Sequence, residues 1–289
     1  MAENTEHGVR LGTVQETLLI PLYGRAVENG KPEPALRDPR AEELVASIDY
    51  DFTRFDGLPS LIGTVLRTSL FDHWIADFLA AHPAGSVVEI GTGLNTRFER
   101  VDNGRVRWFD LDLPDVVDLR QTFFTDSPRR TMIASSVTDG AWADIVTAHS
   151  DGPYFLAAEA VLPFLTESEV RGVIDLVADR FPGSLLALDT AGPGIVDHQN
   201  RHDALSKVEA RMAWACADPT QLNDWRPGTQ VLASHTLSSL PPRMYDELPP
   251  GHQDMLSGLA TQRLPQVEEY RLNLIRFPDL RPGRVSETG

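Results

Sequence analysis

The sequence predicts an α/β fold built on an open, mostly parallel sheet that helices cover on both faces. Two observations carry this prediction. From Ser86 onward, short apolar runs alternate with helical patterns, and the first run leads directly into the turn Gly91-Thr92-Gly93. Nearly continuous apolar runs are typical of strands buried on both faces of a parallel sheet. Five such strands are expected, over 86–91, 106–111, 131–135, 153–158 and 184–189.

The chain before the first strand is predicted to be helical. Helices are expected over 17–28, 38–48 and 60–81. In the third of these helices, apolar side chains recur at helical spacing along the whole segment. We therefore interpret residues 1–82 as an N-terminal helical extension and residues 83–289 as the main domain.

The chain after the fifth strand predicts a cap and the end of the sheet. Residues 192–227 enter through Gly-Pro-Gly and leave through Arg-Pro-Gly, and we interpret them as a helical cap. Two further strands are expected over 229–236 and 269–277, with a Pro-punctuated helical stretch between them. The last run alternates polar and apolar residues, which suits an antiparallel edge pair. The expected sheet thus has seven strands, of which five are parallel.

The glycine turn and an acid on the second strand predict a site for a cofactor that contains adenosine. Gly91 and Gly93 allow the backbone to pass close to a ligand. Asp112 ends the second strand, at the spacing of an acid that accepts hydrogen bonds from ribose hydroxyls, and Asp110 is a competing candidate. A dinucleotide fingerprint needs a third glycine where this chain has Thr96. S-adenosyl-L-methionine, which has no phosphate, is therefore favoured over a nicotinamide cofactor.

These motifs resemble those of a known family. Residues 89–98 resemble the glycine motif of the leucine carboxyl methyltransferase family, which also contains the tetracenomycin-type polyketide O-methyltransferases. Residues 108–114 are similar to its second motif and 158–165 to its fourth, and Arg67 is similar to the family's arginine before the first strand. The resemblance covers about residues 15–192. It implies a Rossmann-like class I methyltransferase fold that uses S-adenosyl-L-methionine.

The resemblance also implies roles for individual residues. The family's matching arginine holds the carboxylate of the cofactor, which assigns that role to Arg67, although a structural ion pair with an acid such as Asp56 is the alternative. Glu159 matches an acid that shapes the cofactor site near the amino group, and helix capping is the alternative. In the family, the acid before a hydrophobic-Pro pair contacts the ribose, which selects Asp112 over Asp110.

The remaining cofactor candidates are Glu89, Ser136 and Val137. Glu89 precedes the glycines, where it either contacts the positively charged cofactor or accepts hydrogen bonds from the amides of the loop. Ser136 and Val137 fall in the family's third motif, and Ser136 stands where many members have an acid. Asn95 likewise replaces a common aspartate of the first motif. These two departures motivate the alternative of a cofactor-binding protein without methyl transfer.

The methyl acceptor is expected beneath the cap. His198 and His202 are four residues apart and would share a helix face, which makes them candidates for a general base, with a solvated surface as the alternative. No third ligand accompanies them, so no metal site is predicted. Trp214 suits an aromatic acceptor, and the alternative location lies around Tyr23 and Arg25. A carboxylate acceptor would need no base, whereas a phenol would need one.

Composition excludes several classes of partner. The net charge of −16 argues against binding to nucleic acid or to an anionic membrane surface. Cys216 is the only cysteine, so the chain has no internal disulfide, and the polar residues 1–10 show no secretory signal. We expect a cytoplasmic monomer or homodimer that methylates a carboxylate or phenol of a small molecule, such as a polyketide-type metabolite of secondary metabolism. A nicotinamide-dependent oxidoreductase is the second enzyme alternative.

Overall fold

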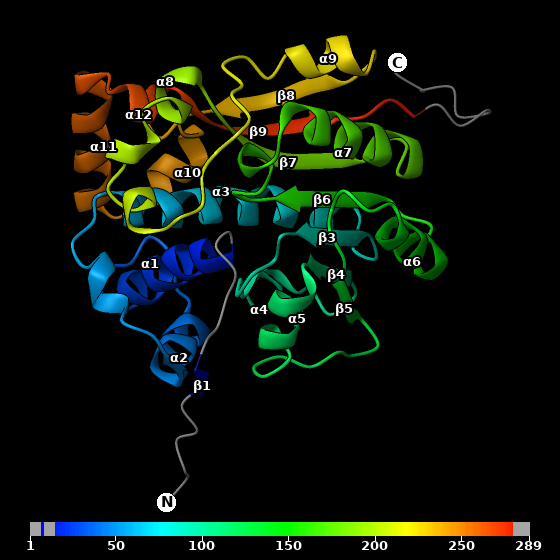
Figure 1. Ribbon diagram of the computed structural model, residues 1–289, viewed down its shortest axis with the longest axis horizontal. Helices are drawn as coiled ribbons and strands as arrows, with labels where there is room; N and C mark the ends of the chain where they lie inside the picture. The colour runs from blue at the N-terminus through cyan, green and yellow to red at the C-terminus, as the bar shows by residue number, and fades with distance from the viewer. Residues whose placement is uncertain (1–6, 9–14, 280–289) are drawn as a thin grey trace, which may run out of the picture.

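A seven-stranded sheet in the order β5-β4-β3-β6-β7-β9-β8 forms the centre of the molecule (Figure 1). The computed structural model describes residues 7–8 and 15–279. All neighbouring strands are parallel except β9, which runs antiparallel to both β7 and β8. The strands are β3 (Ser86–Ile90), β4 (Arg107–Asp112), β5 (Arg130–Ala134), β6 (Tyr154–Ala158), β7 (Leu185–Ala191), β8 (Gln230–His235) and β9 (Tyr270–Arg276).

The strands predicted from the sequence are all present, and each begins and ends within two residues of its expected bounds. The seven-stranded sheet with an antiparallel closing pair is therefore confirmed. The order of that pair adds a detail that the sequence did not show. Strand β9 lies between β7 and β8, so it is an interior strand although it is the last one described. The edge strand on this side of the sheet is β8.

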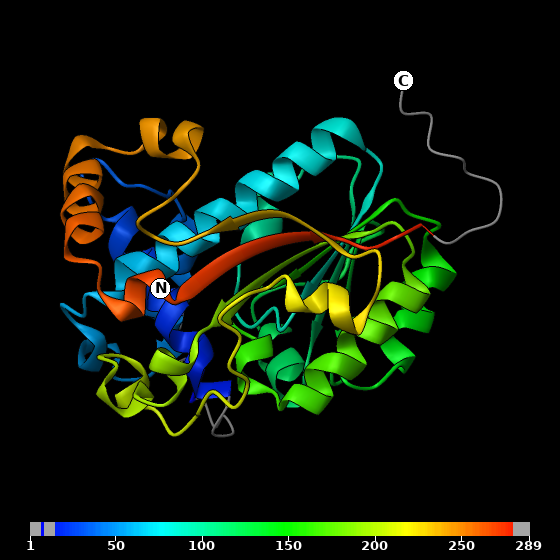
Figure 2. The same cartoon turned by 90° about the horizontal axis from the view of Figure 1, so that it is seen from above.

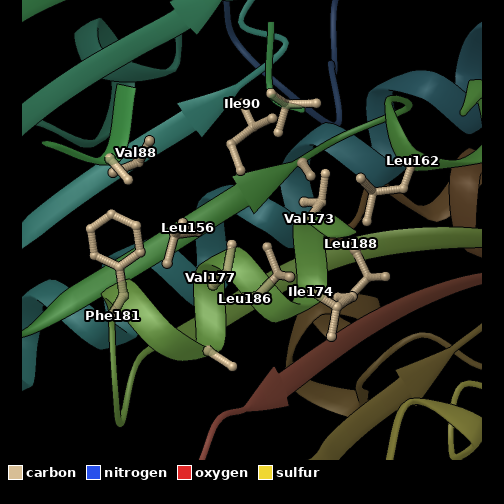
Figure 3. Close-up of a cluster of buried hydrophobic side chains, with 14 of the residues drawn as sticks. Val88, Ile90, Leu156, Leu162, Val173, Ile174, Val177, Phe181, Leu186 and Leu188 are labelled. Atoms are coloured by element: carbon tan, nitrogen blue, oxygen red, sulfur yellow. The ribbon is translucent and has the colours of Figure 1, made fainter. Parts of the chain in front are cut away.

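Helices cover the two faces of the sheet through separate apolar clusters. On one face, α6 (Ala141–His149) and α7 (Glu167–Arg180) pack on side chains of β3, β6 and β7, and Figure 3 shows those of α7 facing the strands. The opposite face is covered by α3 (Ser60–Ala81), which occupies its predicted range. The alternation is visible within β3, where Val88 belongs to the first cluster and Val87 to the second. Two short helices, α4 (Arg97–Val101) and α5 (Pro114–Arg120), follow β3 and β4.

The N-terminal helices form a third apolar cluster. It joins α1 (Leu19–Asn29), α2 (Pro39–Ser47) and the 3₁₀ turns η1 (Gln15–Leu18) and η2 (Phe52–Phe55) to residues that follow β7, including Ile195 and Leu205. Helix α2 begins at Asp38, whose side chain accepts a hydrogen bond from the Ala41 amide. Two isolated segments, β1 (His7–Gly8) and β2 (Ile48–Asp49), pair as a small parallel sheet. The division of the chain at residue 82 stays a prediction.

The prediction that residues 192–227 form a helical segment is wrong. The chain there is mostly irregular, and it contains only α8 (Pro193–Val196), η4 (Gln199–Arg201), η5 (Leu205–Lys207) and α9 (Gln221–Trp225). Side chains take over the backbone hydrogen bonds that a helix would have made. The Gln199 amide donates to the Met212 carbonyl and accepts from the Met212 amide, so it holds this loop closed.

The helical part of the cap lies instead in the Pro-punctuated stretch, as α10 (Pro242–Glu247), α11 (Pro250–Gln262) and α12 (Pro265–Glu268). In Figures 1 and 2, these helices, α1 and α8 gather at one end of the sheet, toward which the arrow of β6 points. The cap therefore lies beyond the carboxyl ends of the parallel strands, where open α/β sheets bind ligands. Within the described residues, none of the helices combines the length and apolar character that crossing a bilayer requires.

Candidate active site

A cavity of about 1040 Å³ opens between the carboxyl ends of the strands and the cap. Its volume lies at the upper limit of the range that small-molecule sites usually have, which leaves room for a cofactor and a second molecule. All of the residues that the sequence predicted for the cofactor contribute to its wall. They are Arg67, Glu89, Gly91, Gly93, Asp112, Ser136, Val137 and Glu159.

The glycine turn after β3 has a conformation that other residues rarely adopt. Gly91 and Gly93 have φ values of 64° and 50°, in the left-handed region. A Cβ atom on Gly91 would also lie 2.3 Å from Cγ2 of Val161. The amides of Gly91 and Thr92 both donate to the Leu111 carbonyl on β4, which anchors the turn. The glycines are thus required by the turn itself, before any ligand is considered.

Two aspartates on β4 have different partners. Asp110 is fully buried and accepts hydrogen bonds from Arg120 and Arg130. Asp112 contributes to the cavity wall, and no arginine of the described residues forms an ion pair with it; its Oδ2 accepts from the Gly93 amide at 2.7 Å. Burial raises the pKa of Asp112 to about 6, against the hydrogen bonds from backbone amides. Asp110 is therefore committed to the core, and Asp112 is the acid that faces the cavity.

Glu89 carries an unsatisfied oxygen in the cavity wall. Its Oε1 accepts a hydrogen bond from Arg97, but its buried Oε2 has no hydrogen-bond partner among the described residues. Burial raises the pKa of Glu89 to about 7, and the Arg97 charge opposes this shift. The alternative in which Glu89 binds amides of the glycine loop is not realised, because Arg97 is the partner that the carboxylate has. An unsatisfied buried oxygen beside a cavity is an acceptor available to a ligand.

Arg67 lies in the cavity wall, held by acids from two strands. Its Nε donates to Glu159 at 2.9 Å and lies 3.8 Å from Asp189, and its Nη1 donates to the Tyr270 hydroxyl at 3.1 Å. Arg67 therefore forms an ion pair, as the alternative prediction had it, but its acidic partners are Glu159 and Asp189 and not Asp56. The remaining nitrogen, Nη2, takes no part in these bonds.

Glu159 follows β6 and is held by two arginines, so it does not cap a helix. Its Oε1 accepts from Arg67 and from the Thr68 hydroxyl, and its Oε2 accepts from Arg97. Although burial opposes ionisation, the two arginines lower the pKa of Glu159 to about 2. The carboxylate therefore stays charged next to the cavity at all ordinary pH values.

Arg97 is a central residue that the sequence analysis did not single out. It is fully buried and donates to three carboxylates from three elements, namely Asp72 of α3, Glu89 of β3 and Glu159 after β6. Arg100, one helical turn later, continues the network to Asp72 and Asp38. The one signal in the sequence is that this arginine lies within the glycine motif, residues 89–98. Buried arginines of this kind are retained only when each is paired.

Tyr23 and Trp214 lie outside the cavity, which corrects their predicted role in binding the acceptor. Tyr23 donates its hydroxyl to Asp56 and stacks on Phe52, with ring centroids 5.4 Å apart. Trp214 is only 1% exposed and belongs to the apolar cluster on the α7 face, where its amide donates to the Pro163 carbonyl. The apolar body of each side chain is therefore used in packing.

Arg25 contributes to the cavity wall, but its guanidinium is already bound. Its Nε donates to Asp38 at 2.8 Å and its Nη2 to the Leu94 carbonyl at 3.0 Å. Asp38 in turn accepts from Arg100, which connects Arg25 to the network around Arg97. The arginine is therefore positioned to support the glycine loop rather than a second molecule.

The two predicted histidines both contribute to the cavity wall, but not from one helix face. His198 is exposed, and His202 follows η4 with its Nδ1 bonded to backbone amides. Another part of the wall is apolar. This part is lined by Ile62 and Leu66 of α3, Met255, Leu256 and Leu259 of α11, and by Leu264, Val267 and Leu272. The cavity thus has a charged end at the strands and an apolar end under the cap.

Comparison with known proteins identifies relatives over most of the chain. The leucine carboxyl methyltransferase family model matches residues 19–178. The tetracenomycin polyketide synthesis O-methyltransferase TcmP of Streptomyces glaucescens is 33% identical over 76% of this chain and 82% of the relative. The S-adenosyl-L-methionine-dependent methyltransferase dpfgK of Gibberella zeae is 26% identical over 76% of this chain and 81% of the relative. A solved structure of a candidate methyltransferase from Thermobifida fusca has a TM-score of 0.55 at 17% identity, covering 90% of this chain and 94% of that one, and it shows a shared fold.

Proposed function

This chain belongs to the leucine carboxyl methyltransferase family, and from that premise we propose how its cavity is used. It is an S-adenosyl-L-methionine-dependent methyltransferase with a Rossmann-like class I fold. We propose that it methylates a carboxylate or phenol oxygen of a small molecule. The observation that carries this proposal is one cavity with charged residues at the strand ends and an apolar wall beneath the cap.

The residues at the charged end fit S-adenosyl-L-methionine. The unsatisfied Oε2 of Glu89 would accept a hydrogen bond from the ammonium group, and Asp112 would accept from the ribose hydroxyls. Arg67 would hold the carboxylate with the nitrogen that its ion pairs leave over. Ser136 and Val137, which follow β5, would line the adenine.

The remaining cofactor residues act through the shape and charge of the wall. Gly91 and Gly93 keep the turn open to a close approach of the ligand. Glu159 stays ionised between Arg67 and Arg97, so the wall keeps a carboxylate charge here. A carboxylate beside the cavity suits a ligand with a positive sulfonium.

The protein's contribution to the reaction is positioning and the exclusion of water. When bound, S-adenosyl-L-methionine supplies an activated methyl group, whose transfer forms an oxygen–carbon bond, breaks the carbon–sulfur bond and leaves the electron pair on sulfur. The apolar wall of α3 and α11 would hold the body of the acceptor and keep water from its oxygen. A carboxylate acceptor requires no base from the chain.

The class of acceptor is inferred from the relatives and from the apolar wall. TcmP is named for tetracenomycin polyketide synthesis. We propose a polyketide-type or similarly apolar acceptor, and with it a place in secondary metabolism and in the cytoplasm. The oligomeric state, monomer or homodimer, stays a prediction.

The alternative of binding without methyl transfer rested on Asn95 and Ser136. In the structure, Asn95 accepts a hydrogen bond from Arg100 at 3.1 Å, as an aspartate would, so this departure is accommodated. Ser136 bonds the hydroxyl of Thr138 and stays in the cavity wall. Neither substitution changes the residues proposed for the ribose or the ammonium group.

Calorimetry followed by a transfer assay tests the proposal. We expect S-adenosylhomocysteine to bind and NAD not to bind. We further expect label from a radiolabelled methyl donor to reach aromatic carboxylic acids or phenols. Binding of NAD alone would indicate the oxidoreductase, and binding of S-adenosylhomocysteine with no transfer to any acid or phenol would indicate a protein that only binds the cofactor.

A further inference from the structure

His202 lies in the wall of the cavity with its ring fixed by the backbone. Its Nδ1 is 3.2 Å from the amide nitrogens of both Ala204 and Leu205, and both amides donate to it. A ring nitrogen that receives hydrogen bonds carries a lone pair and no proton. In neutral His202 the proton is therefore on Nε2, as this hydrogen-bond network assigns it.

One contact of Nδ1 admits a second interpretation. Asp203 Oδ1 lies 3.1 Å from it, which would be an ion pair if Nδ1 carried a proton. The same Oδ1 accepts from the Ala204 amide at 3.0 Å, and Oδ2 accepts from the Ser60 amide at 2.9 Å. The Ala204 hydrogen thus lies between two acceptors. Burial lowers the pKa of His202, and Arg67 adds to this against the charge of Asp203, which agrees with a neutral ring.

Two hydrogen-bond donors on this part of the wall are not used by the protein. Within residues 15–279, no side chain or backbone oxygen accepts a hydrogen bond from Nε2 of His202. The neighbouring Arg201 is exposed on the cavity wall, and no hydrogen bond or ion pair joins its guanidinium to another described residue. In contrast, Arg25 and Arg67 in the same wall are bound to Asp38 and Glu159. The donors of Arg201 and His202 are therefore available to an anion.

We propose that His202 and Arg201 form a subsite for the negatively charged group of the acceptor, with Nε2–H of His202 donating to it and Arg201 supplying positive charge. This proposal rests on the proposed methyl transfer and assigns His202 to positioning rather than to removal of a proton. A neutral ring whose lone pair accepts from the Ala204 and Leu205 amides has no free lone pair that could take a proton from a ligand. The acceptor would therefore arrive ionised, with its apolar body against Ile62, Met255 and Leu259.

Two substitutions separate the two nitrogens of the ring. In His202→Asn, the side-chain oxygen replaces Nδ1 as acceptor for the Ala204 and Leu205 amides, and the donor at Nε2 is lost. In His202→Gln, the amide nitrogen replaces the Nε2 donor, and no titratable group remains. If His202 were a general base, both variants would lose about 10²–10⁴-fold in kcat.

The matched probes are naphthoate and its uncharged counterpart naphthamide, measured by calorimetry on the protein saturated with S-adenosylhomocysteine. We expect the wild type to bind naphthoate about 10–100-fold more tightly than naphthamide, the ratio for one charge-assisted hydrogen bond. His202→Asn and Arg201→Gln should lower this ratio toward one, with naphthamide affinity unchanged. His202→Gln should retain it, as should Arg105→Gln, which removes an exposed arginine outside the cavity wall.

The outcomes separate this subsite from the methyl transfer itself. Equal affinity of the wild type for naphthoate and naphthamide would overturn the subsite, and so would a pH–rate profile that loses its ascending limb in both His202 variants. Melting temperatures within a few degrees of wild type would show that the variants fold. If the probes behave as expected but no acceptor is methylated, the proposed function fails and the anion subsite stands.

Discussion

Asp110 and Asp112 show how neighbours decide the role of a residue. Both side chains lie on β4, and burial raises the pKa of each. For Asp110, the charges of Arg120 and Arg130 reverse this shift and lower its pKa. Asp112 forms no ion pair with an arginine within the described residues, so burial keeps its pKa raised, at about 6. Two aspartates that look alike in the sequence thus become a buried ion-pair member and an acid in the cavity wall.

We predict that Asp112→Ala weakens the binding of S-adenosylhomocysteine by about 10–100-fold, because hydrogen bonds to an ionised acceptor are lost. Calorimetry measures this change, with circular dichroism as the check on folding. Asp110→Ala should instead destabilise the fold, by roughly 3–5 kcal/mol, because Arg120 loses the carboxylate that it pairs with among the described residues and Arg130 keeps only Glu99. Normal cofactor affinity in Asp112→Ala would contradict the assignment.

The raised pKa of Glu89 predicts how the affinity for the cofactor depends on pH. Its pKa is about 7 in the ligand-free protein, so its carboxyl is largely protonated below that pH and cannot attract an ammonium group. We expect the affinity for S-adenosylhomocysteine to increase as pH rises from about 6 to 8, with release of a proton. Titrations in two buffers of different ionisation enthalpy measure that proton. Glu89→Gln should lose this part of the pH dependence, and an unchanged profile in the variant would place the titrating group elsewhere.

The network of Arg97 and Arg100 could not be predicted from the sequence. An arginine three residues before another arginine, among acids, usually indicates a solvated helix face. What buries these side chains is tertiary packing, because Asp38 and Asp72 come from α2 and α3 and meet α4 only in the folded chain. The motifs predicted a set of residues that all lie in the cavity wall, but not the arginines that hold them.

At the scale of elements, secondary structure was predicted correctly where the burial of an apolar run alone determines it. Strands β3 and β6 are apolar runs buried on both faces, so their patterns need no knowledge of their neighbours. Residues 192–227 differ, since their buried side chains pack on two clusters at once: Ile195 on the N-terminal helices and Trp214 on the α7 face. No single helical stripe serves both clusters, and the chain stays irregular. Such loops are built by tertiary contacts that a local pattern does not contain.

Helix α11 is predicted to control the acceptor and not the cofactor. Met255 and Leu259 contribute to the apolar end of the cavity, far along the chain from the glycine turn. Replacing both by alanine removes apolar contact surface and should raise the acceptor KM about tenfold, with the affinity for S-adenosylhomocysteine unchanged. Met244→Ala on α10 is the matched control, since Met244 is buried outside the cavity wall. Equal effects of the two variants on KM would show that α11 acts only through stability.

At the scale of the whole molecule, the buried carboxylates predict how stability depends on pH. Glu89 and Asp112 have pKa values of about 7 and 6, above those of the unfolded chain, so their stabilising effect is present at low pH and lost as pH rises through 6 and 7. Glu159 has a pKa of about 2, below its unfolded value, so its effect is present above about pH 4.5 and lost as pH falls toward 2. The ligand-free protein should therefore be most stable at about pH 5.

Melting curves over a range of pH test this expectation. Between pH 5 and 8 the ligand-free protein should lose a few kcal/mol, which corresponds to a decrease of about 5–10 °C in melting temperature. Saturating S-adenosylhomocysteine at about 100 times its Kd should restore about 2.7 kcal/mol at pH 8. The net charge of −16 adds self-repulsion in the same direction. A melting temperature that rises steadily from pH 5 to 8 would contradict the assignment of Glu89 and Asp112.

The position of β9 has a consequence for the order in which the protein can be made. Tyr270 on β9 bonds Arg67, which lies 203 residues earlier in the chain, and also bonds Asp189 on β7. On the ribosome, Arg67 emerges long before the strand that completes its surroundings. Until β9 docks, β7 has an open edge, β8 has no neighbour in the sheet, and the arginine lacks one of its partners. A nascent chain therefore cannot assemble this end of the cavity before β9 has emerged, and competence for the cofactor comes only with this strand.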